Sequence, residues 1–231
     1  MSGEPAVPGR ALAPGETFIK ICGITRLVDG LAAVEAGASA IGFVFAPSPR
    51  RVGVAEAAAI RAGLPAGVGV IGVFVDAGVD DVLNTADAVG LDGVQLQGSE
   101  GDREVGQVRA RRPDLFITRA IRVTSRTEVT RAGTLVADAV MVDSKDAHRP
   151  SEGHGQLPVA WLAGFRTERL IVAGGLGPDT VGALIAAVRP WGVDVSSGVE
   201  EAPGRKDPAL MHRFVRAVRE GGLVGGGVGR A

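Results

Sequence analysis

Short apolar segments of strand length alternate with amphipathic segments of helix length along nearly all of this 231-residue chain, and this alternation constrains its fold most strongly. The apolar segments carry hydrophobic side chains on consecutive positions, which is typical of parallel strands that are covered on both faces. We expect strands at residues 18–22, 40–45, 68–75, 93–96, 116–120, 139–143, 170–173 and 192–195.

The segments that follow these strands predict eight helices, several of which end at Gly or Pro. They cover residues 26–38, 53–64, 78–90, 102–113, 125–133, 158–165, 178–190 and 207–220, and the fifth and sixth are short and poorly periodic. Eight consecutive βα units in a chain of this length predict an α/β fold, a (β/α)8 TIM barrel. The alternative is a doubly wound open sheet, which usually carries a G-x-G-x-x-G turn after an early strand; "CGITRL" does not fit that pattern.

No break in composition marks a linker, so we expect a single domain, with the barrel over residues 16–220. Residues 1–15 are rich in Pro and Gly and predict a flexible N-terminal leader. The sequence "GGLVGGGVGRA" at residues 221–231 predicts a flexible tail, because glycine-rich segments rarely support a packed element.

The formal net charge is -1, so the chain has no field of one sign that would attract nucleic acid or anionic lipid. Its single cysteine cannot form an internal disulfide, and no apolar run reaches the ~18–20 residues that cross a bilayer. The N-terminus lacks a signal-peptide pattern. We expect a cytoplasmic monomer or homodimer that binds a small molecule, without a metal, because His148, His154 and His212 lack the spacing of metal ligands.

The carboxyl ends of the strands of such a barrel face one common mouth. Two segments there are candidates for phosphate binding: "VAGGLGPDTV", with Gly174 and Gly175, and "VDVSSGVE", with Ser197 and Gly198. They would let backbone amides approach an anion near a helix N-terminus, as barrels often do after strands seven and eight. Taken singly, either segment could consist only of turn-forming residues.

Cys22 and Asp143 end the first and sixth expected strands and are the candidate catalytic residues. A thiol near a phosphate and its counter-cations can act as a base or nucleophile, and a carboxyl group across the substrate can donate or accept a proton. Alternatively, Cys22 is a small buried hydrophobic residue and Asp143 a capping or ion-pairing residue. Arg51 is a candidate for substrate binding, although it or its neighbour Arg50 could be a solvated surface cation.

Seven segments resemble, in order and spacing, the motifs of the phosphoribosylanthranilate isomerase family of tryptophan biosynthesis. They are "KICGITR", "GFVFAPSPRRV", "IGVFVD", "VQLQG", "MVDS", "VAGGLGPDTV" and "GVDVSSGVEEAPGRKD". The resemblance extends from about residue 18 to residue 218, and the first and last of these motifs are highly specific.

This resemblance implies an isomerase that needs no cofactor and acts on a phosphorylated sugar. The implied reaction is the Amadori rearrangement of N-(5-phosphoribosyl)anthranilate to 1-(2-carboxyphenylamino)-1-deoxyribulose 5-phosphate. Asp143 matches the general acid that protonates the furanose ring oxygen, and Cys22 matches the general base that removes the proton from C2. Arg51 matches an arginine near the anthranilate group and Asp194 an aspartate of the mouth, while the four phosphate candidates match the family's phosphate loops.

Two segments depart from the family's usual motifs. The family usually reads Q-L-H-G where this chain has "QLQG", so the substrate-binding candidate Gln97 replaces a histidine; glutamine can hydrogen-bond but cannot titrate. The usual G-G-[ST]-G-x-x-F-D-W becomes "EGHGQLPVAW", which would border the anthranilate side and alter substrate preference. Two further hypotheses are a related phosphosugar isomerase, of the histidine-pathway kind or from specialised metabolism, and a barrel that binds a phosphorylated metabolite without turnover.

Overall fold

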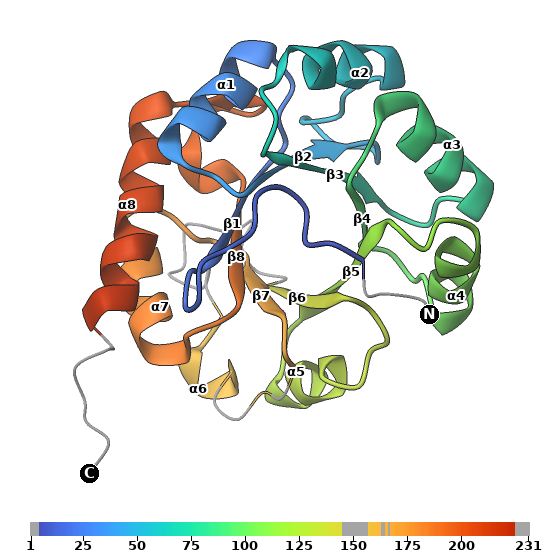
Figure 1. The fold of residues 1–231 in the computed structure, drawn as a ribbon. Coiled ribbons are helices and arrows are strands. Elements are labelled where there is room, and N and C mark those ends of the chain that lie inside the picture. The colour runs from blue at the N-terminus through green and yellow to red at the C-terminus, as the bar shows by residue number, and fades with distance from the viewer. Residues whose placement is uncertain (1–4, 145–156, 163–164, 166, 225–231) are drawn as a thin grey trace.

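The computed structural model describes residues 5–144, 157–162, 165 and 167–224. Eight parallel strands form a closed barrel in chain order, and β8 pairs with β1 to close it (Figure 1). The strands are β1 (Phe18–Cys22), β2 (Ala40–Val44), β3 (Gly69–Phe74), β4 (Gly93–Leu96), β5 (Phe116–Val123), β6 (Ala139–Ser144), β7 (Leu170–Ala173) and β8 (Gly192–Val195). The predicted (β/α)8 TIM barrel is therefore confirmed.

The helices form a ring outside the strands (Figure 1). They are α1 (Leu27–Ala36), α2 (Val54–Gly63), α3 (Val79–Val89), α4 (Asp102–Arg111), α5 (Arg126–Ala132), α6 (Val159–Leu162), α7 (Val181–Val188) and α8 (Pro208–Val224). Helix α8 packs against both α7 and α1, which closes the ring. The two segments with weak helical periodicity, α5 and α6, are also the shortest α-helices of the described chain.

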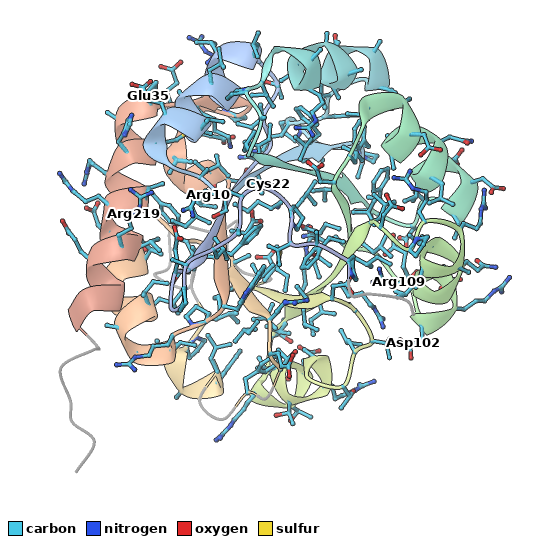
Figure 2. All side chains as sticks on the ribbon, viewed as in Figure 1. Arg10, Cys22, Glu35, Asp102, Arg109 and Arg219 are labelled. Atoms are coloured by element: carbon cyan, nitrogen blue, oxygen red, sulfur yellow. The ribbon has the colours of Figure 1, made fainter. Side chains whose placement is uncertain are left out.

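Side chains alternate along each strand between the helices and the inside of the barrel. On β1, Ile19 and Ile21 belong to the large core between strands and helices, whereas Phe18 belongs to a second cluster inside the barrel. Figure 2 shows side chains filling the ring of strands, while Glu35 and Asp102 project from the outer surface. Both faces of each strand are thus buried, which accounts for their continuous hydrophobic sequence.

The inside of the barrel changes in polarity along its axis. At the amino ends of the strands, Trp191 stacks on Phe18 with a centroid distance of 4.7 Å, and its ring lies 6.1 Å from that of Phe116. Polar side chains occupy the interior nearer the mouth, and those that are buried are Lys20, Gln95, Thr118 and Asp194. The chemistry of the barrel is therefore concentrated at its carboxyl-terminal half.

The N-terminal segment differs from the flexible leader expected over residues 1–15. Residues 5–15 cross the amino-terminal end of the barrel (Figure 1), where Val7 and Leu12 pack against the interior apolar cluster. Pro8 is buried, and the Arg10 backbone N–H donates to the Gly67 carbonyl at 2.9 Å. Residues 5–15 therefore form a compact loop that covers the aromatic end of the barrel, a conformation that Pro and Gly also suit.

The C-terminal helix also differs from the sequence-based boundary, because α8 continues past residue 220 to Val224. Gly221 is buried against α7, where a Cβ on residue 221 would lie 2.7 Å from the Gly182 carbonyl oxygen. A glycine here permits close packing of the two helices. The tail predicted from residue 221 thus begins inside α8, which includes residues 221–224, and residues 225–231 lie outside the described chain.

Candidate active site

A cavity of about 360 Å³ opens at the carboxyl-terminal mouth of the barrel. Residues at or directly after the ends of all eight strands contribute to its lining. Of the nine site residues predicted from the sequence, seven line this cavity: Cys22, Gln97, Asp143, Gly174, Gly175, Asp194 and Ser197. The structure thus brings both candidate catalytic groups and most of the candidate phosphate site to one place.

Cys22 ends β1 and is 7% exposed, at the floor of the cavity. Gly42 on neighbouring β2 makes room for it, because a Cβ on residue 42 would lie 2.8 Å from the Cys22 sulfur and 3.0 Å from Lys20 Cε. The thiol and the lysine are therefore close neighbours. Burial raises the pKa of the Cys22 thiol, an effect opposed by the positive charge of Lys20 and, more weakly, by that of Lys206.

Asp143 lies on β6, on another wall of the same cavity. Burial, together with the negative charge of Asp194, raises the pKa of Asp143 to about 6, although the positive charges of Arg122 and Lys20 oppose this shift. Its Oδ2 accepts a hydrogen bond from Gln97 Nε2 at 3.3 Å. A carboxyl group with this pKa can carry a proton near neutral pH, which a general acid requires.

Asp194 on β8 pairs with Lys20 across the seam that closes the barrel. Lys20 Nζ lies 2.8 Å from Asp194 Oδ1, and the two residues are partners in the β1–β8 register. Burial alone would lower the pKa of Lys20, but the Asp194 carboxylate outweighs it and holds that pKa above its usual range. The pair places a fixed cation directly beside the Cys22 thiol.

The candidate phosphate site is formed by the loops that follow β7 and β8. Gly174 and Gly175 have φ values of 89° and 63°, and Ser197 lies in a short 3-10 helix, η3 (Ser197–Val199). Gly198 does not line the cavity, because it packs against the carbonyl of Leu176 so closely that a Cβ would overlap it. Its role in the structure is to bring the two loops together.

Arg51 is exposed and does not line the cavity, whereas its neighbour Arg50 does. The Arg50 guanidinium donates three hydrogen bonds to Glu200, from Nε to Oε1 at 2.8 Å and to Oε2 at 3.1 Å, and from Nη2 to Oε2 at 2.7 Å. The two arginines therefore have different environments, which the sequence alone could not distinguish. Arg50 holds a loop in place through Glu200, whereas Arg51 is exposed to solvent.

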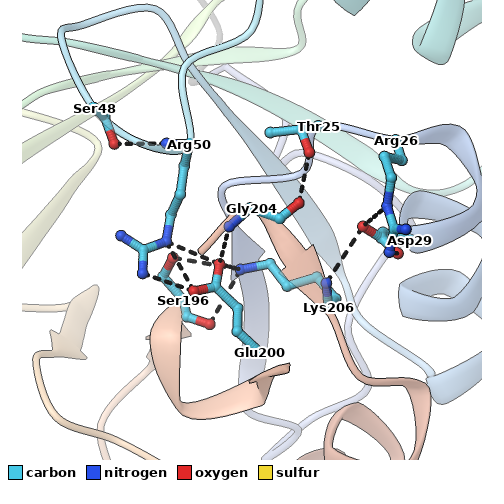
Figure 3. A network of polar contacts seen from close by, with 9 residues as sticks. All are labelled: Thr25, Arg26, Asp29, Ser48, Arg50, Ser196, Glu200, Gly204 and Lys206. Atoms are coloured by element: carbon cyan, nitrogen blue, oxygen red, sulfur yellow. Dashed lines mark hydrogen bonds and ion pairs between the residues drawn. The ribbon is translucent and has the colours of Figure 1, made fainter. Parts of the chain in front are cut away.

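A buried polar network fixes the loop that carries Ser197 (Figure 3). Glu200 accepts hydrogen bonds from Arg50 and from Lys206 Nζ, the latter at 2.8 Å, and Lys206 also donates to the Ser196 carbonyl at 3.1 Å. Burial would raise the pKa of Glu200, but these two cations together lower it. The hairpin of β9 (Glu200–Ala202) and β10 (Arg205–Lys206) is thereby tied to the mouth.

Sequence reasoning missed Lys20, Gln95, Glu200 and Lys206 as parts of the site. The signal for the first two was present: "FIKIC" and "GVQLQG" carry a polar residue within a strand buried on both faces, where it needs a partner. Glu200 and Lys206 lie in a quoted motif, but the hairpin that brings them together has no distinct pattern. The first half of the altered "EGHGQLPVAW" segment, residues 152–156, lies outside the described chain.

A second hollow, between α3 and α4, is lined by carboxylates that include Asp76, Asp80, Asp81, Glu100 and Glu104. Their charges would repel a phosphorylated ligand. Among the described residues, no three His, Cys, Asp or Glu side chains are grouped as metal ligands would be. No helix within the described chain has both the length and the apolar character needed to cross a membrane.

The profile of the N-(5'-phosphoribosyl)anthranilate isomerase family matches residues 19–217. The chain belongs to this family. It is 43% identical over 213 residues to the N-(5'-phosphoribosyl)anthranilate isomerase of Citrifermentans bemidjiense. The alignment covers 90% of this chain and 100% of the relative.

Solved structures of the phosphoribosylanthranilate isomerase family share the fold. A phosphoribosyl anthranilate isomerase crystallised with reduced 1-(o-carboxyphenylamino)-1-deoxyribulose 5-phosphate superposes with a TM-score of 0.77 at 35% identity, over 88% of this chain and 99% of the other. The phosphoribosyl anthranilate isomerase of Thermus thermophilus superposes with a TM-score of 0.77 at 35% identity, over 88% of this chain and 98% of the other. The family resemblance predicted from the motifs is thus confirmed.

Proposed function

We propose that this protein isomerises N-(5'-phosphoribosyl)anthranilate to 1-(2-carboxyphenylamino)-1-deoxyribulose 5-phosphate, with Asp143 as the general acid and Cys22 as the general base. The observation that carries this proposal is that both groups line one cavity, whose rim bears Gly174, Gly175 and Ser197. An acid, a base and a phosphate-binding rim are the parts that a phosphorylated aminosugar needs.

In the first step the Asp143 carboxyl donates its proton to the furanose ring oxygen. The C1–O bond breaks, and the lone pair of the anthranilate nitrogen forms a protonated Schiff base at C1. Burial of Asp143 supports this role, because it favours the neutral acid. The positive charge that develops on nitrogen is balanced by the carboxylate that remains.

In the second step the Cys22 thiolate removes the proton from C2. The electron pair of that C–H bond forms a C1=C2 double bond, and the C1=N electrons return to nitrogen, which gives an enolamine. Lys20 and Lys206 favour this step because their charges stabilise the thiolate. Tautomerisation to the ketone returns a proton to carbon, so the reaction needs no redox partner.

The remaining site residues would bind the substrate. Gly174, Gly175 and Ser197 would hold the 5-phosphate with Gly198 securing their loops; Asp194 and Gln97 would face the sugar. Arg51, which is exposed, is the proposed contact for the anthranilate carboxylate. A cytoplasmic location and a monomeric or homodimeric state are part of this proposal; a solved Thermotoga maritima relative is described as dimeric.

The direct test is turnover of N-(5'-phosphoribosyl)anthranilate by the purified protein, with complementation of a tryptophan auxotroph that lacks this step. Cys22→Ala and Asp143→Asn should each lower kcat by ~10²- to 10⁴-fold, the usual contribution of a general acid or base. Both variants should still bind the product, measured by calorimetry. Near wild-type turnover in either variant would mean that its role is assigned wrongly. Binding of the product without turnover by the wild-type protein would favour the metabolite-binding barrel instead.

A further inference from the structure

Polar side chains inside the barrel form a continuous line of hydrogen bonds that ends on Asp143. Lys20 Nζ donates to Gln95 Oε1 at 3.0 Å, and Gln95 Nε2 donates to Gln97 Oε1 at 2.6 Å. Gln97 Nε2 then donates to Asp143 Oδ2 at 3.3 Å. Lys20 and Gln95 are each 1% exposed, so water does not compete for the inner link.

The direction of this line is set at its inner end. An ammonium group can only donate hydrogen bonds, so Gln95 must turn its carbonyl oxygen toward Lys20 and its NH2 group toward Gln97. Gln97 accepts that bond with its own carbonyl oxygen, which leaves its NH2 group to donate to Asp143. Lys20 is held in place by Asp194. No member of the line can therefore reverse alone without leaving a buried polar group unpaired.

The line makes the two oxygens of Asp143 different. Oδ2 accepts from Gln97, so the proton of the neutral acid is carried by Oδ1. Oδ1 faces Gly174, where a Cβ would lie 2.6 Å away, and Gly174 lines the cavity. The glycine thus leaves open the side of Asp143 from which a proton can be delivered.

We propose that Lys20, Gln95 and Gln97 are positioning residues that keep Asp143 Oδ2 an acceptor, so that the proton used for ring opening is held on Oδ1. This inference rests on the role proposed above for Asp143. It also gives a reason for glutamine at position 97. An amide has no second protonation state, so its link to Asp143 remains a donor at every working pH.

Gln95→Glu tests the direction of the line with almost no change in shape. A carboxylate only accepts hydrogen bonds, so Gln97 would turn its NH2 group toward position 95 and its carbonyl oxygen toward Asp143. Asp143 could then pair only by placing its proton on Oδ2, away from the substrate. We expect kcat to fall by about 10²-fold, with KM changed by less than about threefold, because the phosphate loops are untouched.

Gln97→Leu removes the hydrogen bond to Asp143 without adding charge. It should lower kcat about tenfold, the factor that corresponds to the free energy of one hydrogen bond. The double variant Gln95→Glu/Gln97→Leu has no amide left to reverse, so its kcat should recover to that of Gln97→Leu. Thr118→Val is the matched control. Thr118 is partner to Gln95 in the β4–β5 register and equally buried, but its hydroxyl has no hydrogen bond, and kcat should stay unchanged.

The pKa of Asp143 in each variant, from carbon-13 NMR of labelled aspartate, gives a second readout that needs no turnover. The charged groups that face Asp143 are Asp194, Arg122 and Lys20, and all three are retained. Gln95→Glu should raise this pKa, and Gln97→Leu should raise it less, since only the first gives the protonated acid an acceptor.

Several outcomes would overturn the proposal. Unchanged kcat in Gln97→Leu would do so by itself, which decides the question even where Gln95→Glu fails to fold. Additive losses in the double variant would show that the new charge, rather than a reversed link, lowers the rate. The wild type could be active and Asp143→Asn inactive while the Gln95 and Gln97 variants keep wild-type kcat. That result would contradict this inference and leave the proposed function standing. Absence of wild-type turnover would count against the function, while the Asp143 titration would still test the line.

Discussion

Lys20 Nζ lies 2.8 Å from Asp194 Oδ1, with both side chains at least nine-tenths buried, so the barrel holds a complete ion pair beneath its mouth. A buried pair of this kind contributes little net stability compared with apolar residues, because desolvation of the two charges offsets their attraction. Its position next to Cys22 indicates what the pair does instead. It holds a positive charge beside the thiol that ionises in the proposed mechanism.

Lys20→Met should lower the free energy of unfolding and make the Cys22 thiolate harder to form. The substitution leaves the Asp194 carboxylate buried without its partner, which costs about 3–5 kcal/mol in the free energy of unfolding. It also removes the main charge that lowers the pKa of Cys22, so that pKa should rise further. Urea denaturation measures the first effect and ultraviolet absorbance of the thiolate the second. In Lys20→Met/Asp194→Leu, most of the lost stability should return; stability that stays low would contradict this account of the pair.

A plot of kcat/KM against pH should show a plateau with a fall on either side. The acid of the proposed mechanism has the lower pKa and the base has the higher one. The proposed mechanism needs Asp143 protonated, with its pKa raised to about 6, and Cys22 ionised, with its pKa raised above that of an ordinary thiol. Between these values the loss of acid with rising pH matches the gain of thiolate, so kcat/KM should be constant. It should fall below about pH 6 and again above the thiol pKa. The phosphate of the substrate also titrates near pH ~6, so NMR titration of Asp143 in the free protein is the control, and a value near 4 would contradict the prediction.

The same shift predicts the pH dependence of stability. The folded state binds the Asp143 proton more tightly than the unfolded state, so this stabilisation is complete below the ordinary carboxyl pKa of 3.8 and is lost as pH rises through about 6. Asp143→Asn removes the titration. The free energy of unfolding of the variant, relative to that of the wild type, should be about 2 kcal/mol higher at pH ~7 than at pH ~4. Urea denaturation at the two pH values measures this change, and an equal effect of the substitution at both would exclude the raised pKa.

The sequence was sufficient for those parts of the molecule whose residues act through strand position. Cys22, Asp143 and Asp194 could be placed at the mouth because each lies at the end of a well-defined apolar strand. The separation of Arg50 from Arg51 could not be predicted, because it depends on which guanidinium meets Glu200, about 150 residues further along the chain. The hydrogen-bond line to Asp143 was also out of reach, since three strands must close into a barrel before its members meet.

The Glu200 network should control substrate binding more than chemistry. Glu200→Gln leaves Arg50 and the buried Lys206 without their counter-charge, so the loop that carries Ser197 should loosen. We expect KM to rise about tenfold and kcat to change less, because Cys22 and Asp143 lie on strands that the network does not hold. Glu201→Gln is the matched control. Glu201 pairs with Arg205 on the exposed side of the same hairpin, where an ion pair is worth ~0–1 kcal/mol, and KM should not change. Equal effects of the two substitutions would rule out a specific role for Glu200.

The N-terminal segment should stabilise the barrel without affecting catalysis. Val7 and Leu12 cover the aromatic end of the interior, at the opposite end of the strands from the active site. Because both are only partly buried, Val7→Ala/Leu12→Ala should lower the free energy of unfolding by about 2 kcal/mol while kcat and KM stay as in the wild type. Val28→Ala, on the exposed side of α1 at 60% exposure, is the control and should change stability by less than ~0.5 kcal/mol. Thermal unfolding followed by circular dichroism, with steady-state kinetics on the same samples, separates the two effects. If the double variant unfolds like the wild type, residues 5–15 do not act as a cover. A loss of kcat with unchanged stability would instead connect this end of the barrel to the chemistry at the mouth.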